Sequence, residues 1–262
     1  MTVALAGIAL SSVTQFFAIQ TRAQQGHTYR VEAQQALRSS LDAMTRDIRL
    51  AGACLPSSGA YVPLAGTNGP GPDAITVRTG IVAGNLACVW AGVRDPGMAQ
   101  GSTTVPVDST NGFTAGTFAY LSHPSGSGQY AFVTAVGATT ITLSVAATVD
   151  YPRGSGLYAI DERTYSVDAT DPILPKLMLT LNRGVPEVFA VGVSDLQFRY
   201  VLNRNCPTCD VVDAPAPTDT ATWRLVSDVL LSETVKTVGT HRIQDMVTLS
   251  QTSRAKPRNL LP

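Results

Sequence analysis

The stretch VALAGIALSSVTQFFAIQ, residues 3–20, decides how this chain is interpreted, because it precedes the first charged side chain, Arg22. Apolar and small residues there are enough for about six turns of helix. The run has roughly the length of a membrane span, but Ser, Thr and Gln dilute it. A signal peptide would need a basic residue before its apolar run, and no basic residue precedes Val3. The stretch therefore reads as the beginning of a longer helix.

The helical pattern continues beyond the first charged residue. Its apolar positions are spaced by four, three and four residues: Leu37, Leu41, Met44 and Ile48. This spacing predicts one stripe on a helix that packs against a globular head. The helix should end near Gly52, a suitable C-terminal cap, with Pro56 just beyond. We expect one helix over 1–53, with a half in membrane or filament core (1–21) and an amphipathic half (22–53).

Composition indicates an exported, β-rich protein. The chain has 262 residues, with 19 basic and 19 acidic side chains, so it lacks the positive charge that nucleic-acid binding requires. Only 15% of the residues are charged, below the usual quarter. The four cysteines fit two disulfides in an oxidising compartment.

The remainder of the chain, 54–262, alternates β-branched or aromatic residues with small polar ones, and turns separate the runs. Alternation is clearest at Val133, Val136, Ile141, Leu143 and Val145. We expect an α+β fold in which the helix packs on an antiparallel β-sheet head. The stretch 100–160 reads as a small β-barrel or sandwich inserted into that head.

No pattern of residues indicates catalysis. Cys206 and Cys209 form a CPTC motif. A redox motif needs its first cysteine at a helix amino terminus, where its pKa falls, and no helix signal follows. A structural disulfide is the preferred interpretation, with zinc as a third option that would need two more ligands. Cys54 and Cys88 lack paired spacing, and we expect a bridge between them. No acid–base pair, metal set or nucleophile motif stands out, so we expect neither an enzyme nor a cofactor.

The charged residues at the end of the helix have two interpretations. They are Asp42, Arg46, Asp47 and Arg49. Such residues usually form a solvated face with pairs spaced four apart. The alternative is a set of ion pairs with neighbouring subunits.

Three stretches resemble one family. YRVEAQQALRSSLDAMTRDIRLAGAC (Tyr29–Cys54) closely resembles the helix end of PilW-like minor pilins of type IV pili. GVSDLQFRYVL (Gly192–Leu202) and TLSQTSRAKPRNL (Thr248–Leu260) resemble their later strands. The resemblance implies the type IV pilin fold. It also implies a protein held in the inner membrane with a periplasmic head and then moved into the pilus, often near its tip.

The resemblance implies a function in pilus assembly and priming rather than in chemistry. The assembly helix would use Val3, Leu5, Ile8, Leu10, Val13, Phe16 and Phe17. Expected partners are other minor pilins and the major pilin, with no nucleic acid and no small-molecule substrate. The family's leader and Gly-Phe-Thr-Leu-x-Glu motif are expected directly before Met1. Two alternatives remain: a J-like minor pseudopilin of type II secretion, and a membrane-anchored adhesive module.

Overall fold

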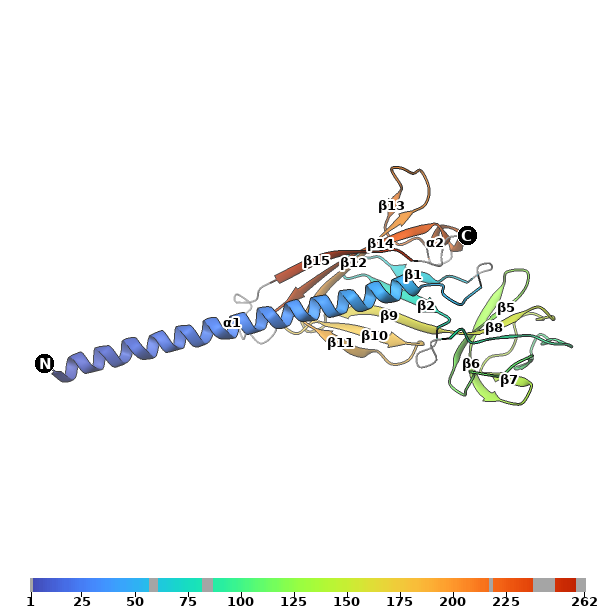
Figure 1. Ribbon diagram of the computed structural model, residues 1–262, viewed down its shortest axis with the longest axis horizontal. Coiled ribbons are helices and arrows are strands. Elements are labelled where there is room, and N and C mark those ends of the chain that lie inside the picture. Colours follow the sequence, from blue (N-terminus) through green and yellow to red (C-terminus); the bar gives the residue numbers. More distant parts are fainter. Residues whose placement is uncertain (1, 57–60, 82–86, 217–218, 238–247, 258–262) are drawn as a thin grey trace.

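The computed structural model describes residues 2–56, 61–81, 87–216, 219–237 and 248–257. For 2–13, 18–19 and 22–23 it describes the backbone and not the side chains. The fold is α+β: a long amino-terminal helix packs on antiparallel sheets, and a further β-rich unit lies at the far end (Figure 1). The expected fold class is confirmed, and the arrangement is consistent with a pilin-like fold.

Helix α1 runs from Thr2 to Leu50 and ends where the sequence predicts. Gly52 adopts a φ of +78°, a left-handed conformation that glycine accepts without strain. Its N–H donates to the carbonyl of Arg78 at 2.9 Å, and the N–H of Gly80 donates to the carbonyl of Ala53 at 2.7 Å. The end of the helix is thereby joined to the end of a strand.

The first sheet has five antiparallel strands in the order β1-β2-β9-β10-β11. They are β1 (Leu64–Thr67), β2 (Ala74–Thr79), β9 (Asp161–Asp168), β10 (Lys176–Leu181) and β11 (Glu187–Val191). Asn182 and Arg183 take φ values of +48° and +59° between β10 and β11. Positive φ at both positions suits a tight hairpin turn.

The second sheet has four antiparallel strands in the order β13-β12-β14-β15. They are β12 (Val193–Leu202), β13 (Val211–Val212), β14 (Val226–Lys236) and β15 (Thr248–Ala255). A short helix, α2 (Thr220–Arg224), precedes β14 and begins at the capping carboxylate of Asp219. Helix α1 contacts β14 and β15 of this sheet and β2 and β11 of the first sheet.

A third sheet of six antiparallel strands forms a separate unit, in the order β3-β8-β5-β6-β7-β4. The strands are β3 (Trp90–Gly92), β4 (Thr104–Pro106), β5 (Phe118–Ser122), β6 (Gly128–Val136), β7 (Thr140–Leu143) and β8 (Gly156–Ala159). This inserted unit leaves from the end of β2 and returns at the start of β9, and these two strands pair with each other. It begins about ten residues before the expected boundary at 100, because β3 pairs with β8.

The head and the inserted unit each have a hydrophobic core of their own. One core unites the α1 stripe with side chains of the first two sheets, including Trp223, Tyr200 and Phe198. The other lies within the inserted unit and includes Val133, Ile141 and Leu143. Val136 and Val145, which the alternation also singles out, remain 37% and 43% exposed.

Candidate functional site

The amino-terminal half of α1 projects from the head as a free helix (Figure 1). Ala33 is its first buried residue among those whose side chains are described. Phe16 and Phe17 are 57% and 61% exposed, and their rings meet edge to face with centroids 6.4 Å apart. Of the expected assembly residues, Val3, Leu5, Ile8, Leu10 and Val13 lie on the α1 backbone, but their side chains are outside the described ones. A helix that exposes adjacent phenylalanines has an apolar surface available for partners.

Hydroxyl groups on the projecting half bond back to the helix itself. Thr21 Oγ1 donates to the Phe17 carbonyl at 2.8 Å, and Thr28 Oγ1 donates to the Gln24 carbonyl at 3.1 Å. This lowers the cost of placing these hydroxyls among apolar neighbours. Among the described residues, no helix has a stretch that is both long enough and apolar enough to cross a membrane.

The carboxyl-terminal half of α1 lies in the core of the head. Leu37 and Leu41 are 5% and 3% exposed, and Met44 and Ile48 are fully buried. All four belong to the core that the two sheets of the head share. Burying four such side chains supplies several kcal/mol, which fixes the direction in which the free half projects.

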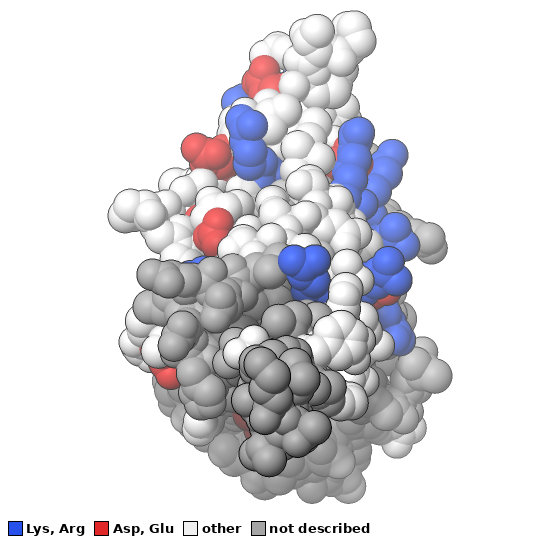
Figure 2. Space-filling model, turned by 90° about the vertical axis from the view of Figure 1, so that its left-hand side faces the viewer, with Lys and Arg blue, Asp and Glu red and all other residues white. Residues whose placement is uncertain are grey.

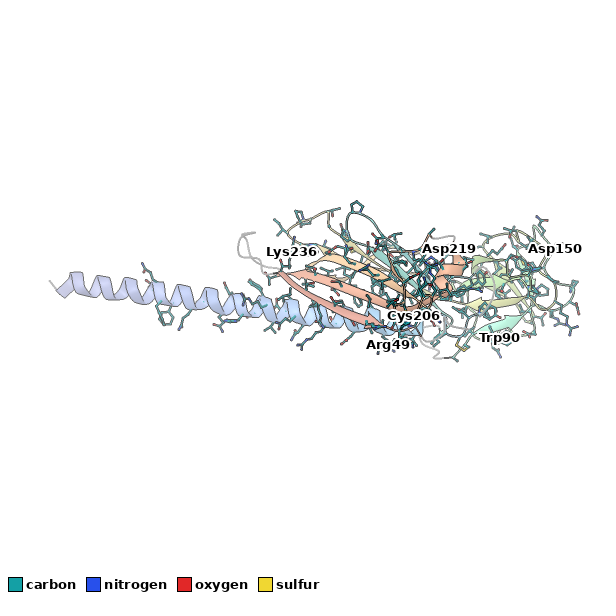
Figure 3. The ribbon with its side chains drawn as sticks, turned by 90° about the horizontal axis from the view of Figure 1, so that it is seen from above. Arg49, Trp90, Asp150, Cys206, Asp219 and Lys236 are labelled. Carbon is teal, nitrogen blue, oxygen red and sulfur yellow. A yellow bond between two sulfur atoms is a disulfide. The ribbon has the colours of Figure 1, made fainter. Side chains whose placement is uncertain are left out.

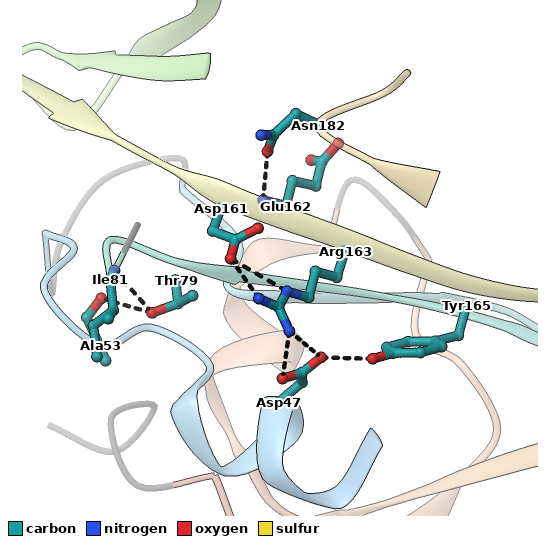
Figure 4. A network of polar contacts seen from close by, with 9 residues as sticks. All are labelled: Asp47, Ala53, Thr79, Ile81, Asp161, Glu162, Arg163, Tyr165 and Asn182. Atoms are coloured by element: carbon teal, nitrogen blue, oxygen red, sulfur yellow. Dashed lines mark hydrogen bonds and ion pairs between the residues drawn. The ribbon is translucent and has the colours of Figure 1, made fainter. Parts of the chain in front are cut away.

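Asp47 joins the same half of the helix to β9 through a polar network (Figure 4). Its carboxylate accepts hydrogen bonds from Arg163 Nη1 at 3.1 and 3.2 Å and from the Tyr165 hydroxyl at 2.6 Å. Arg163 also donates to Asp161 from Nη2 at 2.8 Å and from Nε at 3.2 Å. Every charged member therefore has a partner, as a buried ionic group requires.

Two members of this network, Tyr165 and Arg163, have pKa values above their ordinary ones. Burial, followed by the Asp47 charge, raises the pKa of the Tyr165 hydroxyl. Burial alone would lower the pKa of Arg163, but hydrogen bonds and charges from Asp161 and Asp47 outweigh burial and raise it. Near neutral pH the Tyr165 phenol therefore stays neutral and the Arg163 guanidinium stays charged, so these contacts hold the helix rather than transfer protons.

A second polar contact under the helix joins Ser40 to Glu233 of β14, and both residues are fully buried. Ser40 Oγ lies 2.7 and 2.8 Å from the two carboxyl oxygens of Glu233 and 2.7 Å from the Ala36 carbonyl. One hydroxyl proton cannot serve all three acceptors. Protonation of Glu233 resolves the conflict, since the carboxyl group then donates to Ser40 and Ser40 donates to Ala36. Burial raises the pKa of Glu233 to about 7, partly offset by Ser40.

Neither of these contacts is among the expectations from the sequence. Those expectations place Asp47 with Asp42, Arg46 and Arg49 on a solvated or intersubunit face, whereas Asp47 is only 7% exposed. The signal that could have found them is the spacing itself. Ser40 and Asp47 each follow a stripe residue, Leu37 or Met44, by three positions, so they lie on the buried face.

The structure contains two disulfides, Cys54–Cys88 and Cys206–Cys209. The first links the end of α1 to the stretch leading into β3, and the ideal Cβ of an alanine at Gly80 would lie 2.8 Å from the Cys54 carbonyl. The second closes a loop between β12 and β13, where Arg204 Nε lies 2.6 Å from Asp210 Oδ2. No helix begins at Cys206 in this described loop, so the motif does not lie at the helix amino terminus that a redox motif uses.

The head and the inserted unit meet at a small aromatic and ionic junction. Tyr61, Phe118, Tyr120 and Ile160 form its buried centre. Glu162 pairs with Arg78 and, at 3.1 Å, with Arg183. The Arg183 guanidinium lies 4.7 Å from the ring centroid of Tyr130 and 5.1 Å from that of Phe118. Stacked and charged contacts of this kind hold two units in one relative orientation.

The described residues offer no evident site for a metal. Within them, no three His, Cys, Asp or Glu side chains are close enough to hold an ion. His123 Nδ1 accepts a hydrogen bond from the Ser125 backbone N–H at 2.9 Å, which makes it part of a turn.

Seen from the end at which α1 projects, basic side chains gather along one edge while acidic ones are scattered (Figure 2).

In comparisons with known proteins, no family model matches this chain and no curated protein matches it in sequence.

Proposed function

We propose that this protein is a minor pilin of the PilW-like type, which acts in type IV pilus assembly through helix and head packing and without catalysis. The observation that carries the proposal is the division of α1. Its carboxyl-terminal half is sealed into the head core, and its amino-terminal half exposes Phe16 and Phe17 far from the head. The resemblance of Tyr29–Cys54 to the helix end of these pilins also supports it.

The physical step is an exchange of surroundings for the projecting half. Before assembly this half lies in the inner membrane, and after assembly it packs among the helices of other minor pilins and the major pilin. Residues 2–21 of α1 carry no charged side chain, and several of them are small, including Ala4, Ala6, Gly7 and Ala9. Small residues permit close approach of helices. The two disulfides suit the proposed periplasmic location of the head.

The test introduces charge where the helix is exposed. Phe16→Glu with Phe17→Glu in the full-length chain, supplied to a strain lacking the gene, should reduce surface pili to the level of that strain. Charged side chains are costly in lipid and in a helix-packed core. Gln24→Glu, at another exposed position of α1, is the matched control and should preserve piliation.

The same strains separate this proposal from its alternatives. Type II secretion is measured beside pilus number. Normal pili with lost secretion would indicate that the protein is a pseudopilin of type II secretion and not a minor pilin. Normal pili and normal secretion, with loss of surface attachment alone, would favour an anchored adhesive module.

A further inference from the structure

We propose that the inserted unit carries a binding site for a neutral saccharide, formed by Trp90, Tyr158 and Asp108. This goes beyond a role in assembly, because the site lies at the end of the molecule opposite the projecting helix. Figure 3 shows Trp90 and Asp150 on the inserted unit, whereas Lys236 lies near the projecting half of α1.

The two faces of the inserted sheet differ in chemistry. Ala91, Leu157 and Leu121 point into the aliphatic core of the unit. The opposite face carries one aromatic residue from each of four neighbouring strands, aligned by strand pairing: Trp90, Tyr158, Tyr120 and Tyr130. Tyr120 and Tyr130 are occupied by the junction with the head, where Tyr120 meets Tyr61 with ring centroids 5.4 Å apart. The row continues outward to Trp90 and Tyr158, which the junction does not cover.

Trp90 and Tyr158 form a stacked aromatic pair that is exposed at Trp90 and half-buried at Tyr158. Trp90 is 55% exposed, and its ring lies 21° from parallel with the Tyr158 ring, with centroids 6.3 Å apart. The indole N–H and the phenol hydroxyl have no hydrogen-bond partner among the described residues. The faces of such rings are negative and attract the slightly positive C–H groups on one side of a pyranose ring.

A carboxylate is fixed directly beside this aromatic pair. Gly92 and Gly156 pair across the strands one step along the same face. The Tyr158 ring lies over Gly156, since the ideal Cβ there would be 2.6 Å from the ring. The Asp108 carboxylate occupies the side-chain position of Gly92, since the ideal Cβ there would be 2.8 Å from Oδ2. These two glycines therefore bring a ring and a carboxylate together on the surface.

Asp108 is held so that one oxygen stays available. Its Oδ1 accepts from the Gly92 N–H at 2.8 Å, and its own N–H donates to the Gly92 carbonyl at 3.0 Å. Oδ2 has no hydrogen-bond partner among the described residues, and a sugar hydroxyl makes a strong bond to such an oxygen. Val93 is buried in the core of the unit, so the exposed Arg94 lies on the opposite face beyond Gly92, and this face carries charges of both signs. This balance favours a neutral, hydroxylated ligand over an anion or a cation.

The test uses the two tryptophans of the full chain. Trp223 is fully buried and Trp90 is exposed, so a ligand at the site changes only the Trp90 emission. Purified protein in a detergent without sugar groups is titrated separately with cellotriose, chitotriose and maltotriose. We expect saturable binding of at least one of them. Asp108→Asn, which keeps the Oδ1 contact, should weaken that binding several-fold, because a neutral amide replaces the charge-assisted hydrogen bond that the Oδ2 atom would make.

Isothermal titration extends the test to a variant without the reporter. Trp90→Ala should abolish binding, whereas Phe189→Ala, a half-exposed aromatic on β11, should leave it unchanged. Circular dichroism checks that each variant is folded. The proposal is overturned if none of the three saccharides binds at millimolar concentration. Saccharide binding by Trp90→Ala that equals the binding by the parent chain also overturns it.

Discussion

Glu233 is a carboxyl group sealed under α1, and its environment makes the stability of the head depend on pH. Its pKa of about 7 lies above its ordinary value of 4.5 because burial disfavours the charge. The stabilising contribution is therefore complete below pH 4.5 and is lost as pH rises through 7. Full ionisation should cost on the order of 3 kcal/mol.

Glu233→Gln removes this titration and keeps an amide that donates to Ser40. We expect the variant to gain thermal stability relative to the parent chain at pH 8 and to gain little or nothing at pH 4. Melting curves across that range measure the difference. Glu187→Gln, on the exposed start of β11, is the control and should follow the parent chain at every pH. A Glu233→Gln difference that does not vary with pH would contradict the assignment.

Asp47, like Glu233, contributes to the packing of α1 on the head. Asp47→Ala leaves the Tyr165 hydroxyl without its acceptor and Arg163 with Asp161 alone. We expect a loss of about 2–3 kcal/mol in the free energy of unfolding in urea, because a buried pair is broken. Asp42→Ala, exposed on the preceding turn, should change it by less than about 0.5 kcal/mol. Equal effects of the two substitutions would show that the network is not structural.

At the scale of elements, the sequence predicts what depends on local pattern. The stripe from Leu37 to Ile48 and the glycine at 52 determine the helix and its end, and both follow from spacing and capping alone. Strand β3 falls outside the expected bounds of the inserted unit, because three residues carry little periodic signal and its partner β8 lies more than sixty positions away. The contacts of Asp47 and Ser40 depend on Arg163, Tyr165 and Glu233, which are more than a hundred residues distant, and no local rule connects them.

The two disulfides constrain elements of very different size. Cys54–Cys88 spans 34 residues and holds the end of α1, whereas Cys206–Cys209 spans only 3. In the chain-entropy model, removing the first should cost about 3–4 kcal/mol and removing the second about 2 kcal/mol. Thermal melts of the paired variants, Cys54→Ala with Cys88→Ala and Cys206→Ala with Cys209→Ala, measure the two losses. A larger loss for the short loop would mean that loop entropy does not govern how much each bridge stabilises the fold.

At the scale of the whole molecule, the inserted unit has its own core and joins the head through two strands that already pair. Thr79 of β2 lies opposite Asp161 of β9, so a two-residue turn can close the gap that removal of the unit would leave. Replacing 80–160 by Asn-Gly, with Cys54→Ser, should therefore leave the helix and both head sheets folded. Some stability should be lost because Tyr61 loses its aromatic partner Tyr120.

This deletion provides its own reporter. Trp90 is removed, and Trp223 becomes the single tryptophan, packed edge to face on Tyr200 with ring centroids 4.9 Å apart. Its emission should remain that of a buried indole and should shift only on thermal unfolding in one cooperative step. Emission typical of a water-exposed indole before heating would show that the head cannot fold without the unit. The junction of Arg78, Glu162 and Arg183 would then be part of one cooperative core, because the head would depend on contacts across it.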